Sequence, residues 1–271
     1  MEFSVLISIY KNERSAYFRE ALDCVFTQTI QPNEIVLVKD GPLTDELEEV
    51  IFEYATIHPI FKILTNEVNL GLGRSLAKGI SACSNEYIAR MDTDDKMPCD
   101  RFEKELEKLN EGYDVVSCWS LLYDIDIQHP VAIKKRPATH DEILALAKKC
   151  SPICHAGCMY RKSMVLKAGN YQHCYLYEDY HLWVRMFLAG ARFSNVQEVL
   201  YFVRTSYDMI GRRGGWLYAS NEIRTFIYFY EIGFYTLMDL FKNVVTHFPI
   251  RIMPLFVRSY LMRRLWNYKT S

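Results

Sequence analysis

Hydrophobic and polar positions over the first 125 residues alternate between a strand-like pattern and a helical pattern. Short, mostly apolar runs predict strands at 3–10, 34–41, 61–67, 86–92 and 114–124. Between them, apolar residues recur with the period of a helix at 15–29, 44–55, 72–83 and 100–112. Strands that are apolar on both faces and alternate with helices predict an α/β fold. We expect a mostly parallel, Rossmann-like sheet with helices on both faces.

The alternation fades after residue 125. Helical patterns cover 140–150 and 177–191, a strand or turn is expected at 155–163, and another strand at 198–204. From Trp216 onward the pattern is helical and rich in aromatic residues. We therefore expect one sheet-containing domain over 1–205, followed by a C-terminal helical extension over 206–271.

Composition narrows the class of protein. The 271 residues are 50% hydrophobic and 24% charged, so a packed core is expected. The net charge of -1 gives no argument for a nucleic-acid partner. No run of 18 apolar residues and no basic leader are present, so we expect neither a transmembrane helix nor a signal peptide, and a cytoplasmic location.

The eight cysteines raise the question of zinc. Cys150, Cys154 and Cys158 are spaced four apart around His155, and Cys174 follows. The close cysteine pairs typical of zinc sites are absent, and scattered cysteines in a reduced compartment are most often small buried hydrophobes. We assign no zinc.

Three carboxylates, Asp92, Asp94 and Asp95, directly follow the fourth predicted strand. Parallel sheets bind ligands beyond the carboxyl ends of their strands. Two carboxylates separated by one residue can converge there on Mg²⁺ or Mn²⁺. The alternative is a solvated loop in which one Asp favours the start of the helix near Pro98.

Two further sets of polar residues have open interpretations. Glu178 and Asp179 stand in the first turn of a predicted helix, as a favourable cap or as a general base. The ends of the first two strands carry Ser8, Tyr10, Asn12, Glu13 and Asp40. These residues suit either a nucleobase site or ordinary turns.

Together these segments carry a resemblance to a known family. The chain resembles the family 2 glycosyltransferases, nucleotide-sugar-dependent enzymes of the GT-A fold, over roughly residues 3–205. The resemblance rests on FSVLISIYKNE with the following FTQT, EIVLVKDGPLTDE, NLGLGRSLAKGI, YIARMDTDDKMPCDRFEKE and YEDYHLWVRMFLAGARF. It implies a nucleotide-binding half at about 1–95 and an acceptor-side half at about 96–205.

The resemblance also implies roles for single residues. Asp94 would bind the metal, with Asp92 beside the metal or the ribose, and Asp179 would be the catalytic base with Glu178 next to it. The residues expected around the nucleotide-sugar are Ser8, Tyr10, Glu13, Asp40 as the partner of uracil, Arg74, Lys78, Asp92, Thr93 and Asp95. His155 lies in a segment resembling the one that lines the donor and acceptor side. Lys39 departs from the family's acidic pattern, and would contact phosphate or acceptor, or simply be solvated.

Beyond residue 205 the chain resembles bacterial surface-polysaccharide transferases, through the segment RTSYDMIGRRGGW. Arg212 and Arg213 there would grip a diphosphate or lie in a charged loop. The basic stretch 251–269 suggests peripheral contact with anionic lipid, with a packed helix as the alternative.

The implied activity is transfer of a sugar from a UDP-sugar to a lipid-diphosphate-linked glycan with inversion, using Mn²⁺ or Mg²⁺. Two other classes of protein are alternatives. A sugar-1-phosphate nucleotidyltransferase would carry a glycine-rich loop after the first strand, and ISIYKNERSA has no glycine. A carbohydrate- or nucleotide-binding module without catalysis would not need Asp92, Asp94 and Asp179.

Overall fold

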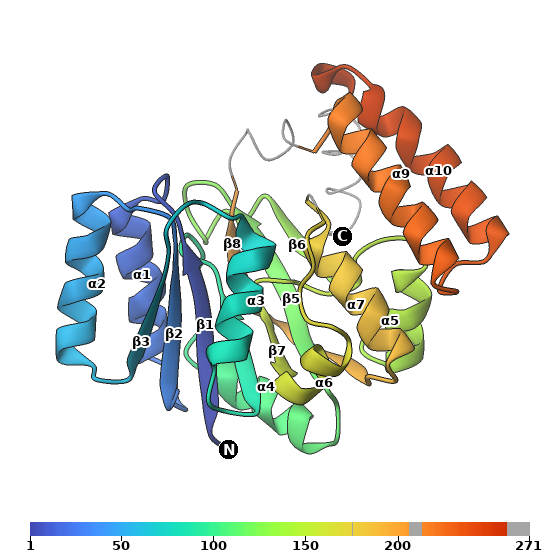
Figure 1. Ribbon diagram of the computed structural model, residues 1–271. Helices are drawn as coiled ribbons and strands as arrows, with labels where there is room; N and C mark the ends of the chain where they lie inside the picture. Colours follow the sequence, from blue (N-terminus) through green and yellow to red (C-terminus); the bar gives the residue numbers. More distant parts are fainter. Residues whose placement is uncertain (175, 206–212, 259–271) are drawn as a thin grey trace.

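The predicted strands join one eight-stranded sheet in the computed structural model, which describes residues 1–174, 176–205 and 213–258 (Figure 1). The strand order is β3-β2-β1-β4-β7-β5-β6, and β8 pairs with β5. The strands are β1 (Phe3–Ile9), β2 (Glu34–Asp40), β3 (Phe61–Asn66), β4 (Tyr87–Met91), β5 (Val115–Tyr123), β6 (Ala132–Lys134), β7 (Cys158–Arg161) and β8 (Phe193–Arg204).

The first half of the sheet is parallel and the second half is mixed. Strands β3, β2, β1 and β4 run parallel, as the alternation with helices predicts. Strand β7 lies antiparallel between β4 and β5, so the fifth predicted strand does not continue the parallel series beside β4. The segment 155–163, left open as strand or turn, supplies this inserted strand.

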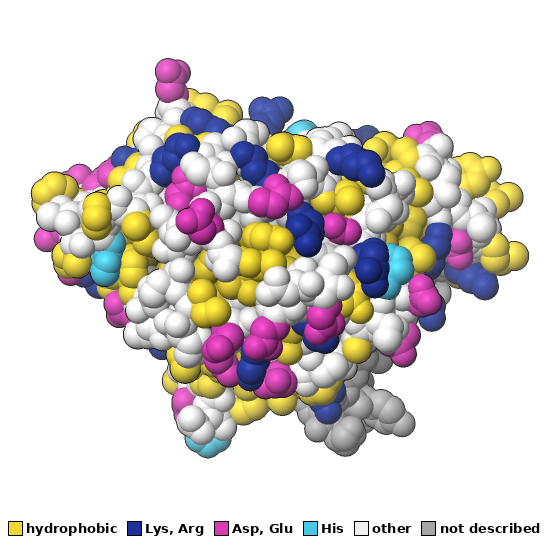
Figure 2. All heavy atoms as spheres, turned by 90° about the horizontal axis from the view of Figure 1, so that it is seen from below, with side chains coloured by type: hydrophobic (Ala, Val, Ile, Leu, Met, Phe, Trp, Pro, Cys, Tyr) yellow, Lys and Arg dark blue, Asp and Glu magenta, His cyan; other side chains and the backbone are white. Residues whose placement is uncertain are grey.

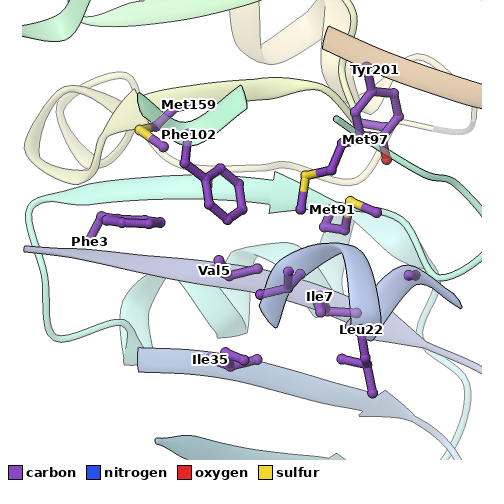
Figure 3. Packing of buried hydrophobic residues seen from close by; sticks show 14 of the residues in the cluster. Phe3, Val5, Ile7, Leu22, Ile35, Met91, Met97, Phe102, Met159 and Tyr201 are labelled. Carbon is purple, nitrogen blue, oxygen red and sulfur yellow. The ribbon is translucent and has the colours of Figure 1, made fainter. Parts of the chain in front are cut away.

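Helices cover both faces of the sheet. One face carries α1 (Ser15–Phe26), α2 (Asp45–Ile57) and α4 (Arg101–Asn110). The other carries α3 (Leu72–Ala82), α6 (Lys162–Lys167) and α7 (Glu178–Leu188). Strand β1 shows why both are needed, because Phe3, Val5 and Ile7 point into the first layer (Figure 3) while Leu6 belongs to the second.

One glycine sets the distance between α3 and the sheet. A Cβ atom on Gly79 would lie 2.3 Å from Leu6 Cδ1 and 3.1 Å from Val38 Cγ2. The helix therefore packs closely on β1 and β2 only because this position has no side chain. The start of α3 is thereby held above the carboxyl ends of these strands.

The C-terminal extension forms a helical hairpin, α9 (Trp216–Glu231) and α10 (Leu237–Ile252), beside α7 and α5 (His140–Ala147) (Figure 1). An aromatic cluster joins this hairpin to α7, with Tyr180 and Val184 packed among Tyr218, Phe226 and Phe229. Among the described residues, no helix is long and apolar enough to cross a membrane.

Candidate active site

A cavity of about 470 Å³ opens where β1, β2 and β4 end. Its other walls come from the start of α3 and from the segment before α7. The lining residues are Ser8, Tyr10, Glu13, Asp40, Asn69, Leu70, Gly71, Leu72, Gly73, Arg74, Asp92, Thr93, Asp94, His173, Cys174, Leu176 and Glu178. Of the strand-end residues named from sequence, Ser8, Tyr10, Glu13 and Asp40 meet at one edge of the sheet, whereas Asn12 is not among the lining residues. The volume suits a small organic ligand.

The three aspartates after β4 lie together, with one carboxylate oxygen of each within 4.8 Å of the others. Arg90 Nη2 donates to Asp92 Oδ1 over 2.6 Å. From the end of β8, the backbone N–H of Arg204 donates to Asp95 Oδ1, and Arg204 Nε donates to the carbonyl of Asp94. The loop is held from two sides, and these contacts leave the Asp94 side chain facing the cavity.

Crowding of these acids shifts their proton affinity. Burial, reinforced by the charge of Asp92, raises the pKa of Asp94 to about 6. The pKa of Asp95 is also raised well above its usual range, mainly by burial and further by repulsion from Asp94 and Asp92. A cation between the carboxylates would relieve both effects. Carboxylate oxygens at this spacing fit a divalent cation such as Mg²⁺ or Mn²⁺, and Asp92 and Asp94 are the two of these aspartates that line the cavity.

Asp40 is a buried anchor as well as a lining residue. Its Oδ1 accepts from the backbone N–H of Leu70 at 2.8 Å and from Asn66 Nδ2 at 3.1 Å, and its Oδ2 accepts from Gly71 N–H at 3.0 Å. A carboxylate has about four acceptor positions, so these three bonds leave one for a ligand. Asp40 therefore fixes the loop that leads into α3, a role that the sequence did not suggest.

Lys78 is part of the same support and does not line the cavity. Its Nζ donates to the carbonyl of Thr65 and to Asn66 Oδ1, and Asn66 in turn binds Asp40. Lys39 forms an ion pair with Glu48 at 2.5 Å, which occupies it within the protein. Of the predicted basic residues that the structure describes, Arg74 is the one that lines the cavity.

The acidic pair at the start of α7 divides between two environments. Glu178 lines the cavity, and burial raises its pKa to about 7. Asp179 is not among the lining residues, and its Oδ2 accepts a hydrogen bond from Ser151 Oγ at 2.9 Å. One carboxylate is therefore turned toward the cavity, and the other is hydrogen-bonded to Ser151.

His155 packs away from the cavity. Its Nε2 lies 2.6 Å from the hydroxyl of Tyr171, and its ring meets Trp183 edge to face. Burial, with the nearby charge of Arg90, holds the pKa of His155 well below its usual range, so the ring is neutral. Arg213 is exposed near Arg251, and Arg212 lies outside the described residues.

Sequence reasoning missed several parts of the site. The loop Asn69–Gly73, His173, Cys174 and Leu176 also line the cavity, and Arg90 and Arg204 hold its acidic loop. Two glycines gave a usable signal. Gly71 has a φ of 88°, and a Cβ on Gly73 would lie 3.2 Å from Glu178 Cβ, so this loop requires small residues.

Comparison with known proteins identifies the family. The protein-family model described as Glycosyl transferase family 2 matches residues 4–168. The chain belongs to this family. It is 34% identical to the amylovoran biosynthesis glycosyltransferase AmsE of Erwinia amylovora, over 93% of this chain and 96% of AmsE. It is 33% identical to the UDP-Gal:alpha-D-GlcNAc-diphosphoundecaprenol beta-1,3-galactosyltransferase of Escherichia coli, over 97% and 96% of the two chains.

Solved structures confirm the GT-A fold expected for this glycosyltransferase. The mannosyltransferase PcManGT of Pyrobaculum calidifontis, in complex with GDP-Man and Mn²⁺, superposes with a TM-score of 0.65 at 14% identity, over 99% of this chain and 84% of that one. Residues 1–349 of S. aureus TarS, in complex with UDP-GlcNAc, give a TM-score of 0.65 at 16% identity, over 93% and 72%. At such identities the likeness concerns the fold.

Proposed function

We propose that this glycosyltransferase moves a sugar from a UDP-sugar to a hydroxyl of a lipid-diphosphate-linked glycan, in the synthesis of a bacterial surface polysaccharide. The observation that carries the proposal is the meeting of Asp92, Asp94 and Glu178 in one cavity at the carboxyl edge of the sheet. The activity named for the E. coli relative, transfer from UDP-Gal to a GlcNAc-diphosphoundecaprenol, supports this class of donor and acceptor. With such an acceptor, the reaction would take place at the cytoplasmic face of the membrane.

The charge of the cavity calls for a divalent cation. Among the described residues that line it, five are carboxylates (Glu13, Asp40, Asp92, Asp94 and Glu178) and one is an arginine, Arg74. A diphosphate would meet net repulsion in this setting unless a cation lay between the two groups. Asp94 and Asp92 would hold Mn²⁺ or Mg²⁺, which would stabilise the negative charge of the departing nucleoside diphosphate. Thr93 and Asp95 complete the loop beside the donor.

The nucleoside would lie against β1 and β2. Tyr10 offers an aromatic face for the base, and Asp40 keeps one acceptor position for an N–H of uracil. Ser8 and Glu13 line the same wall and offer partners for the ribose. Arg74, at the opposite wall, would contact the diphosphate.

Transfer itself requires a base at the rim of the cavity. Asp179 would take the proton of the acceptor hydroxyl while that oxygen forms a bond to C1 of the donor sugar. The bond between C1 and the diphosphate oxygen breaks with its electrons on UDP. Attack from the face opposite to the leaving group inverts the anomeric centre. Glu178 would border the donor sugar.

Thermal unfolding with nucleotide-sugars tests the proposal, because a ligand that binds only the native state raises its stability. We expect one UDP-sugar to raise the unfolding temperature in Mn²⁺ and to have little effect with chelator, and Asp94→Asn to lose this shift. Failure of every nucleotide-sugar in Mn²⁺ would refute the proposal. Pyrophosphate-producing activity from a sugar 1-phosphate and UTP would indicate a nucleotidyltransferase instead.

Donor binding alone does not separate an enzyme from a binding module. Release of UDP from the bound donor, with or without an acceptor, would establish turnover. A chain that binds the donor with Mn²⁺ and never releases UDP would be the inactive module.

A further inference from the structure

The outer face of α10 is apolar along its whole length. Half of the exposed large hydrophobic side chains among the described residues fall between Trp216 and Phe256. On α10 the stripe consists of Leu237, Met238, Phe241, Val245, Phe248 and Ile252. At about 100° per residue these six side chains lie within an arc of about 100°. Asn243 and His247, on the opposite side, face the protein.

Further apolar side chains extend this stripe at one end. The ring of Trp216, from the start of α9, lies 5.9 Å from that of Phe248 and is 73% exposed. Phe256, beyond the end of α10, is 77% exposed. At the other end of the hairpin, Figure 2 shows apolar side chains at the right-hand edge of the molecule, where Figure 1 places the turn between α9 and α10. Exposed apolar patches of this extent mark interaction surfaces.

We infer that this surface, the α10 stripe with Trp216 and Phe256, lies in the head-group region of an anionic lipid bilayer. The inference rests on the proposed function, because it supplies the route by which a lipid-linked acceptor would reach the site. It also differs from the expectation drawn from the basic stretch 251–269, since the surface is apolar and begins at residue 216.

Charge favours lipid over a second copy of the chain. Residues 213–258 contain five basic and three acidic residues, and the pair of Glu222 with Arg251 accounts for one of each, so basic residues remain in excess. Lys242 is exposed at the border of the stripe, close to the middle of α10. Two stripes paired about a two-fold axis would bring two such lysines together, whereas anionic head groups would meet opposite charge.

The shape of the hairpin suits contact at the membrane surface. Its helices have 16 residues each, and no described helix can span a bilayer. An apolar stripe bordered by a lysine and by an exposed tryptophan is typical of helices that lie in the interface. The hairpin rises on the side of the sheet where β1 and β4 end, so the cavity mouth and the lipid would be neighbours (Figure 1).

Sedimentation with vesicles tests the inference on the full chain. We expect binding to vesicles of phosphatidylglycerol and phosphatidylethanolamine in equal parts, and weaker binding to phosphatidylcholine. The double variant Phe241→Ser, Phe256→Ser should bind these vesicles at least about tenfold more weakly than the native chain. Phe52→Ser is the matched control, because Phe52 is 75% exposed on α2 at the far end of the molecule (Figure 1). Val245→Glu, which removes little volume, should weaken binding as well.

Two results would overturn the inference. One is vesicle binding that is absent, or equal in the Phe241/Phe256 and Phe52 variants. The other is a dimer in solution that dissociates in the Phe241/Phe256 variant, which would assign the stripe to a second copy. The rise in unfolding temperature that the donor causes should be the same in these variants as in the native chain. If the native chain binds vesicles but no UDP-sugar, the proposed function is refuted and the inference about the membrane surface stands.

Discussion

At the scale of single residues, the carboxylates of Asp92 and Asp94 differ because their partners differ. Asp92 commits one oxygen to Arg90, whose side chain is 1% exposed. Asp94 is held through its backbone carbonyl by Arg204, so its side chain stays available to a ligand. The sequence predicted that these aspartates would meet a cation. It gave no sign of the arginine beneath Asp92, since a buried charge on a strand is recognised only once its partner is placed.

Arg90 is the first residue to test. Arg90→Met leaves Asp92 without its cation and should lower the free energy of unfolding by roughly 2–4 kcal/mol. It should also weaken Mn²⁺-dependent UDP binding, because Asp92 loses its fixed orientation. Arg90→Lys keeps the charge and should retain most of the stability and most of the UDP binding. Nε and Nη1 of Arg90 have no hydrogen-bond partner in the protein, so a lysine loses little by lacking them.

Urea unfolding and calorimetric titration of UDP with Mn²⁺ measure these effects. Arg19→Met is the control, because its pair with Glu53 is exposed and should contribute less than about 1 kcal/mol. Equal losses of stability in the Arg90→Met and Arg19→Met variants would contradict the role given to Arg90.

The acidic pair at the start of α7 gives a second test. Asp179→Asn should lower turnover about a hundredfold or more and leave UDP affinity unchanged, because it removes only proton transfer. Glu178→Gln should keep turnover within about tenfold, since an amide of the same size still borders the donor. Steady-state rates with a defined acceptor decide the roles. A large loss of turnover in Glu178→Gln, together with near-normal turnover in Asp179→Asn, would instead assign the role of base to Glu178.

At the scale of elements, local patterns predicted more than long-range contacts did. The parallel strands and the helices between them follow from periodicity, because each pattern is contained in a few residues. The position of β7 does not, since nothing within 155–163 shows that it inserts between β4 and β5. For the same reason the link from Asp40 to the start of α3, some 30 residues away, was missed.

The α9–α10 hairpin depends on one buried carboxylate. Arg251 donates to both oxygens of Glu222, at 2.9 and 2.8 Å, and His247 Nδ1 lies 3.0 Å from Oε1. Burial alone would raise the pKa of Glu222, but these hydrogen bonds outweigh it and lower the pKa to about 2. The folded chain therefore favours the ionised form more than the unfolded chain does.

This difference predicts acid sensitivity. The contribution of Glu222 is complete above about pH 4.5 and is lost as the pH falls from there toward about 2. A shift of this size corresponds to roughly 3 kcal/mol. Glu222→Gln should be less stable near pH 7 and should lose less stability on acidification than the native chain. Urea unfolding at about pH 7 and about pH 3 compares the two, and parallel losses would contradict the prediction.

At the scale of the whole molecule, the division at residue 205 expected from sequence does not separate two cores. Phe226 and Phe229 of α9 pack with Tyr180 of α7, the helix that also carries Glu178 and Asp179. The helical, aromatic-rich pattern from Trp216 onward indicated an extension, but it did not indicate that the two parts share buried surface. The extension therefore packs against the helix that carries Glu178 and Asp179, and so helps to hold these residues in place.

Shared burial predicts a single unfolding transition. Phe229 is fully buried and meets the ring of Tyr180 edge to face at 4.8 Å, so Phe229→Ala should cost about 3–5 kcal/mol. In one cooperative unit this loss lowers the whole transition, by roughly 10 °C for a chain of this size. Ile227→Ala is the control, because this neighbouring side chain is 41% exposed and should shift the transition little. Scanning calorimetry distinguishes the cases. Two transitions, of which Phe229→Ala lowers only one, would show that the extension unfolds separately, and that the support it gives α7 is not cooperative.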